Sequence, residues 1–155
     1  MISMRAKAAL VLVVLTLAIG LQAGPARSSD VIGNWKAEIS FGSGPVRSLR
    51  FELRSSGKGV FLPPLGPEPN QILPTDPGSA QWSQSDGQSF RISGPVQFPL
   101  GNIAIERGTL ILEGKLKGGN TITGKASFFP ADQNPATAGA KPSKAGTFKA
   151  TRITG

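Results

Sequence analysis

Strict alternation of apolar and polar residues, in one stretch after another, is the feature that most constrains the fold of this chain. In "WKAEISF", Trp35 to Phe41, the odd positions are apolar and the even positions are polar, and "LRFELR", Leu49 to Arg54, repeats the pattern. Successive side chains of a β-strand point to opposite faces, so such alternation indicates strands with one buried face and one face in water. The sequence therefore predicts an all-β fold.

The alternation predicts eight strands, and "NIAI", Asn102 to Ile105, is a candidate for a further short strand. The ends of the predicted strands are defined to within about two to four residues. The eight predicted strands span residues 32–41, 47–55, 58–63, 80–85, 88–97, 108–117, 120–129 and 146–153.

The connections between the predicted strands are of two kinds. The second, fourth and sixth predicted strands are followed by tight glycine turns, "SSGKG", "SDGQ" and "GGN". The odd-numbered strands are followed by longer or looser connections, which are "GSGPV", the Pro-rich "PLGPEPNQILPTDPGS", the segment 98–107 and "ADQNPATAGAKPSKA". In an up-and-down meander, alternate connections lie at opposite ends of the sheet. We therefore predict a single antiparallel up-and-down barrel or strongly coiled sheet, with a tight-turn end and an open end framed by loops.

The N-terminal segment has the order of a secretory signal peptide. Arg5 and Lys7 precede an uncharged, mostly apolar run over residues 8–20, and small residues surround 23–26. The apolar run is short for a membrane span of roughly 20 residues. We predict a signal peptide over 1–26, cleaved between Ala23 and Ala26, and one β-barrel domain over 27–155 that is secreted or periplasmic and has no integral membrane segment. About 130 residues suffice for one hydrophobic core.

The net charge of +8 arises from 17 Lys and Arg against 9 Asp and Glu. A basic surface could attract nucleic acid, anionic lipid or an acidic polysaccharide. The basic residues are scattered singly along the predicted strands, which is typical of solvated strand faces. An oligonucleotide-binding surface would place aromatic residues among the basic ones, but the aromatic residues here fall mainly in the apolar set. We therefore predict no nucleic-acid partner.

The composition removes much of the usual chemistry of enzymes, because the chain has no His, Cys or Tyr. The common general base near neutral pH, thiol nucleophiles and soft metal ligands are therefore lacking. A carboxylate pair built from Glu68 and Asp76 is conceivable, but loop acids are ordinarily solvated. We predict a non-catalytic protein with no metal and no cofactor.

The opening "GNW" and the closing "FKATRI" together resemble the calycin and lipocalin pattern. In those families a Gly-x-Trp begins the first strand, and a basic residue of the last strand packs across the Trp to close the barrel floor. The matching residues are Gly33, Trp35 and Arg152. The layout is also similar to small exported bacterial proteins of uncharacterised function with an early Gly-x-Trp and a terminal Arg. The resemblance implies a lipocalin-like barrel in which Trp35 plugs the tight-turn end, and an Arg over an indole contributes about 0.5–2 kcal/mol.

Two functions are compatible with this sequence. The predicted interior is apolar apart from Arg152 and includes small residues such as Ala37 and Gly124, which either allow tight coiling around a filled core or leave room for an apolar ligand. The first hypothesis is therefore binding of a small hydrophobic ligand. The alternative is an exported protein-interaction module, protease inhibitor-like or envelope-associated, that acts through its long loops. The candidate ligand-binding residues are Ile39, Phe41, Leu49, Leu62, Trp82 and Phe98, although for Trp82 a core position is favoured over the mouth.

Overall fold

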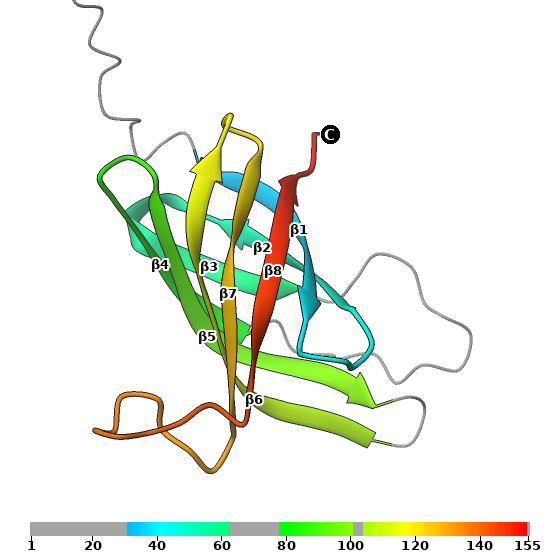
Figure 1. The fold of residues 1–155 in the computed structure, drawn as a ribbon. Helices are drawn as coiled ribbons and strands as arrows, with labels where there is room; N and C mark the ends of the chain where they lie inside the picture. The colour runs from blue at the N-terminus through cyan, green and yellow to red at the C-terminus, as the bar shows by residue number, and fades with distance from the viewer. Residues whose placement is uncertain (1–30, 63–77, 101–103, 155) are drawn as a thin grey trace, which may run out of the picture.

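The computed structural model describes residues 31–62, 78–100 and 104–154, and their regular structure is almost entirely β-strand. The predicted signal peptide over 1–26, the loop acids Glu68 and Asp76, and Asn102 lie outside these residues. Figure 1 shows antiparallel strands arranged as a ring.

Consecutive strands pair with one another, and the last strand pairs with the first, so that the sheet closes into a barrel (Figure 1). The predicted all-β, up-and-down barrel of eight strands is confirmed. A short 3-10 helix, η2 (Ser55–Gly57), forms the turn after the second strand. The strands are β1 (Gly33–Ser40), β2 (Arg47–Leu53), β3 (Lys58–Leu62), β4 (Gly78–Ser85), β5 (Ser89–Leu100), β6 (Ala104–Lys117), β7 (Thr121–Pro130) and β8 (Lys144–Arg152).

The seam between β1 and β8 has small residues at two places where the strands come close together. Ala37 lies opposite Ala150 in the register of the two strands. A Cβ atom at Gly146 would overlap the carbonyl oxygen of Ser40. Only glycine therefore allows β8 to approach the end of β1 this closely, and the sheet can curve tightly where it closes.

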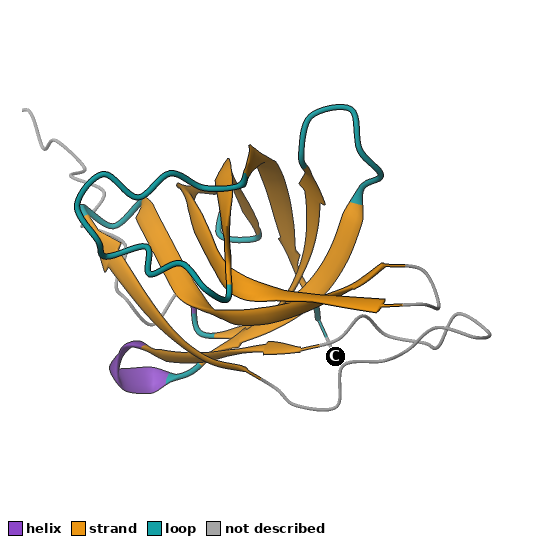
Figure 2. Ribbon diagram, turned by 90° about the horizontal axis from the view of Figure 1, so that it is seen from below, coloured by secondary structure: helices purple, strands orange, loops and turns teal. Residues whose placement is uncertain are grey.

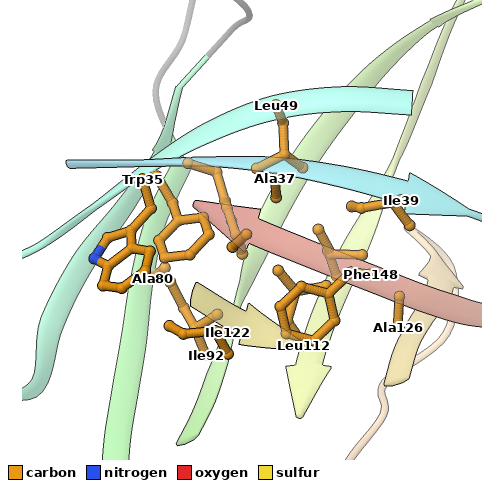
Figure 3. Packing of buried hydrophobic residues seen from close by; sticks show 14 of the residues in the cluster. Trp35, Ala37, Ile39, Leu49, Ala80, Ile92, Leu112, Ile122, Ala126 and Phe148 are labelled. Carbon is orange, nitrogen blue, oxygen red and sulfur yellow. The ribbon is translucent and has the colours of Figure 1, made fainter. Parts of the chain in front are cut away.

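Inward-facing side chains fill the barrel (Figure 3), and the largest of them form an aromatic group near the tight-turn end. Trp35 stacks on Phe51 with ring centroids 6.2 Å apart, and Phe51 stacks on Phe90 at 6.1 Å. Phe61 meets Phe51 edge-on at 6.4 Å. Offset-stacked and edge-on rings are favourable arrangements, and each such pair adds about 0.5–1.5 kcal/mol beyond the burial of its area.

The β5–β6 hairpin differs from the prediction. The segment 98–107 was expected to be a loose connection, but β5 continues to Leu100, β6 begins at Ala104, and these two residues pair. Ile105 belongs to β6 rather than to a separate short strand. The predicted strand 88–97 already continues through Pro95, but Pro99 interrupts the readable pattern because proline has no N–H group to donate to a ladder. The hairpin consequently extends past its neighbours at the open end (Figures 1 and 2).

The turn between β4 and β5 shows how glycine turns set the tight-turn end. Asp86 and Gly87 both have positive φ, at 49° and 70°, as hairpin turns of this type require. The Asp86 carboxylate accepts hydrogen bonds from the Ser89 backbone N–H at 2.8 Å and from the Ser89 hydroxyl at 3.0 Å. These bonds, and a weaker one from the Gln88 N–H, hold the pKa of Asp86 below its usual value.

Asp86→Asn tests this turn, because Asn tolerates positive φ but lacks the anionic acceptor. A lowered folded-state pKa stabilises the fold above the ordinary value of 3.8, and the stabilisation is lost as the pH falls through the lower, folded-state pKa. We expect the variant to melt at a lower temperature than the parent at neutral pH, with the difference shrinking as the pH falls below 3.8. Circular dichroism melts at several pH values measure this. Asp132→Asn, at an exposed loop aspartate, is the control; equal melting of parent and Asp86→Asn at neutral pH would contradict the expectation.

Candidate functional site

A cleft of about 320 Å³ lies at the open end, between the β1–β2 loop and the beginning of β8. Its wall combines apolar, glycine and basic residues from two segments that are distant in sequence and adjacent in the closed barrel. The lining residues are Phe41, Gly42, Gly44, Pro45, Arg47, Ser143, Lys144 and Ala145.

Three phenylalanines lie at this end of the barrel, and we call them the open-end aromatic cluster (Phe41, Phe98 and Phe128). Phe98 and Phe128 are buried, and their ring centroids are 5.8 Å apart. Phe41 is half-buried and meets Phe98 edge-on at 6.4 Å. The cluster therefore joins the wall of the cleft to the hydrophobic core.

Three charged side chains, which we call the rim triad (Arg47, Glu106 and Lys144), surround the open-end aromatic cluster. Lys144 donates to both carboxylate oxygens of Glu106, and its Nζ–Oε2 distance is 2.6 Å. Arg47 Nη2 lies 3.5 Å from the same Oε2 atom. The Arg47 Cζ atom is 5.0 Å from the centroid of the Phe98 ring, and Lys144 Nζ is 5.6 Å from that of Phe128. Both cations thus lie within cation–π range of a buried ring.

The rim triad corrects the expectation that the interior is apolar apart from Arg152. Arg47, Glu106 and Lys144 each occupy an inward position of the strand alternation, two residues before Leu49, Gly108 and Gly146. Their side chains are only 17%, 22% and 33% exposed. None of the three was predicted to face inward, because a charged residue in an alternating strand indicates a face in water. Continuing the alternation of each strand by two residues toward the open end would place all three side chains on the inward face.

Four of the predicted ligand-binding residues lie in the part of the barrel nearer to this cleft. Phe41 lines the cleft, and Phe98 lies beneath Arg47. Ile39 is fully buried in the core, and Leu49 is buried at the next inward position after Arg47. Phe41 is the one predicted residue that the cleft itself exposes.

Trp82 and Leu62 are placed differently. The indole Nε1 of Trp82 donates to the carbonyl oxygens of Arg54 at 2.8 Å and Lys58 at 2.9 Å, which flank the β2–β3 turn at the tight-turn end. Trp82 is therefore a core residue held at the far end from the cleft. Leu62 is half-buried at the last position of β3.

The tight-turn end brings together the three residues of the Gly-x-Trp resemblance. Arg152 lies opposite Trp35 in the register, and its Cζ atom is 4.7 Å from the centroid of the Trp35 ring. Arg152 Nη1 donates to the Ile32 carbonyl at 2.8 Å, and the buried Trp35 Nε1 donates to the Val31 carbonyl at 2.9 Å. Gly33 has φ +132°, and a Cβ there would lie 3.1 Å from Arg152 Nη1. The three residues therefore contact one another, and the role of Trp35 as a plug of the barrel floor stays a prediction.

A second, more open hollow of about 530 Å³ lies over the outer faces of β4 to β7. Its charged side chains are well exposed; Arg91 and Glu113, for example, pair at 2.5 Å with about half of each side chain in water. Solvated pairs of this kind contribute little energy, and the further cations of this hollow, Lys115 and Lys125, are exposed and therefore screened by water and salt. The open-end cleft is therefore the better candidate site.

Comparisons with protein-family models, with curated proteins and with solved structures give no match. Within the described residues, no group of three or more His, Cys, Asp or Glu side chains could hold a metal ion. None of the helices in that part of the chain is long and apolar enough to span a membrane. Fold and site together define a small eight-stranded up-and-down β-barrel with an amphipathic cleft at its open end.

Trp35→Ala tests the plug at the tight-turn end. Truncating a fully buried Trp leaves a cavity, so we expect the free energy of unfolding to fall by roughly 3–5 kcal/mol. Arg152→Met, which keeps an apolar stem but removes the cation, should cost only about 0.5–2 kcal/mol. Urea unfolding followed by circular dichroism measures both. If Trp35→Ala unfolds at the same urea concentration as the parent, Trp35 is not the plug.

Glu106→Gln tests the rim triad, and Glu113→Gln on the same strand is its matched control. Removing the Glu106 charge leaves two partly buried cations without the carboxylate that they share, so we expect a loss of about 1–3 kcal/mol. Glu113 pairs with Arg91 in water, and its substitution should cost less than about 1 kcal/mol. Urea unfolding of the two variants compares them directly. Equal losses would show that the triad contributes no more than a surface ion pair.

Proposed function

We propose that the protein is an exported, non-catalytic, lipocalin-like β-barrel that binds a small hydrophobic molecule at its open end. The observation that carries the proposal is the cleft of about 320 Å³, with Phe41 in its wall and the open-end aromatic cluster beside it. Small-molecule sites are concave and mostly apolar, with a few polar groups that fix orientation, and the mouths of β-barrels are frequent locations.

Three features, two of the sequence and one of the structure, support the other parts of this proposal. The order of basic, apolar and small residues over 1–26 supports export to the periplasm or the medium. The packing of Arg152 over Trp35, beside Gly33, supports the lipocalin-like character of the barrel. The absence of His, Cys and Tyr from the whole chain supports a binding role over a catalytic one.

Titration with N-phenyl-1-naphthylamine, a neutral hydrophobic probe whose fluorescence rises in apolar surroundings, tests the proposed site. We expect saturable binding by the parent, and binding at least about fivefold weaker for Phe41→Ala, because the variant loses apolar wall area worth about 1 kcal/mol or more. Val46→Ala is the control, since Val46 is 64% exposed in the same loop and does not line the cleft. The absence of saturable binding, or an unchanged affinity of Phe41→Ala, would contradict the proposal.

A second candidate function is favoured by the two large apolar side chains exposed near the open end. Val46 is 64% exposed in the β1–β2 loop, and Leu100 is 40% exposed at the last position of β5. Exposed apolar residues beside long connections suit a protein-interaction module. Cross-linking in the exporting cell, comparing the parent with Val46→Ser/Leu100→Ser, separates the two functions. An interaction module should lose its cross-linked partner in the variant while retaining the affinity for the neutral probe.

A further inference from the structure

We infer that the molecule bound at the open end is an amphipathic anion, that is, an apolar chain ending in an acid group, and that Arg47 and Lys144 receive the acid. This inference rests on the proposed function of the same site. It adds the chemistry of the head group and the orientation of the ligand, with the acid at the rim triad and the chain along Phe41.

The first argument is the sign of the charge that the cleft presents. Arg47 and Lys144 are both lining residues of the cleft, whereas Glu106, their shared partner, is not among them. The rim triad as a whole carries one positive charge in excess. All three side chains are mostly buried, so this charge is screened less by solvent and salt than the scattered surface lysines are. An entering molecule therefore meets a local positive potential.

The second argument is the balance of hydrogen-bond donors and acceptors. An Arg and a Lys together carry more N–H donors than one carboxylate can accept. Arg47 uses one of its donors on the Pro99 carbonyl at 3.4 Å, and its guanidinium is 3.5 Å from Glu106, a loose ion pair. Hydrogen bonds between ionised partners are about twice as strong as neutral ones. A second acid group on the cleft side would accept the remaining donors and balance the two cations.

The third argument concerns the rest of the ligand. The wall of the cleft next to Arg47 consists of the half-buried Phe41 ring, Pro45 and two glycines, Gly42 and Gly44, that have no side chains to fill it. This wall presents apolar surface a short way from the two cations. A molecule that is charged throughout would leave the apolar wall unused. A wholly apolar molecule would cover two cations that share the single carboxylate of Glu106, and the second positive charge would have no anion to balance it, which is costly. An amphipathic anion satisfies both surfaces.

A head-group series tests the inference on the unmodified protein. Decanoate, decyl phosphate, decanol and decyltrimethylammonium share one chain and differ in charge; isothermal titration calorimetry below their micelle concentrations gives the affinities. We expect at least one of the two anions to bind about tenfold or more tightly than decanol, decyltrimethylammonium to bind most weakly, and the preference to shrink as salt is added. The tighter of the two anions identifies the acid group.

Charge variants locate the head group. Arg47→Gln and Lys144→Gln should each reduce the preference for the anion over decanol by about fivefold or more, while Lys149→Gln, an exposed lysine on the same strand as Lys144, should leave it unchanged. Melting curves establish that each variant is folded, and the head-group series does not depend on them. If decanol binds as tightly as both anions, the inference is overturned and the proposed function stands. If none of the four compounds binds, the proposed function itself fails.

Discussion

The antiparallel pairing of β1 with β8 converts a series of hairpins into a ring. Once the ring is closed, each of the eight described strands has a neighbour on both sides, and no strand offers its full length as an edge for unwanted pairing. Closure also fixes which face of every strand points inward. Every second side chain of each strand therefore contributes to one common core. The seam is possible because Ala37 faces Ala150 and because Gly146 lets the backbones approach closely.

At each end of this ring cations pack on aromatic rings, but the two ends differ electrostatically. At the tight-turn end, Arg152 lies over Trp35 and donates to the backbone carbonyls of Ile32 and Gly119, so its N–H groups are engaged by the protein itself. At the open end, Arg47 and Lys144 lie over rings but share a single carboxylate. The first arrangement uses the N–H donors within the protein, and the second leaves a positive charge in excess beside a cleft.

Most of the barrel can be predicted from the sequence because alternation and glycine turns are local signals. The strands and tight turns follow from them, and the meeting of Trp35 and Arg152 follows from the order of the strands. Two features could not be predicted, namely the end of β5 and the rim triad, because the residue types at those positions favour a different structure or a different face. Pro99 hides the last part of β5, which continues to Leu100 and pairs with β6 along its length. The rim triad was hidden because Arg47, Glu106 and Lys144 read as solvated residues, and only the closed ring brings three strands together so that they neutralise one another in part.

The cations of the proposed binding site come together only in the folded barrel, so ligand binding and folding are coupled at the rim triad. Arg47 comes from β2 and Lys144 from β8, so the unfolded chain does not hold these two cations together. An anion bound there would stabilise the folded state, with the logarithm of its concentration once that exceeds the dissociation constant. Well-packed apolar side chains in place of a partly buried charge cluster are often equally or more stabilising. An apolar closure of the open end would therefore suffice for a barrel whose only task is to fold. The charges of the rim triad, at inward positions beside the cleft, are therefore consistent with the proposed anionic ligand rather than with a purely structural role.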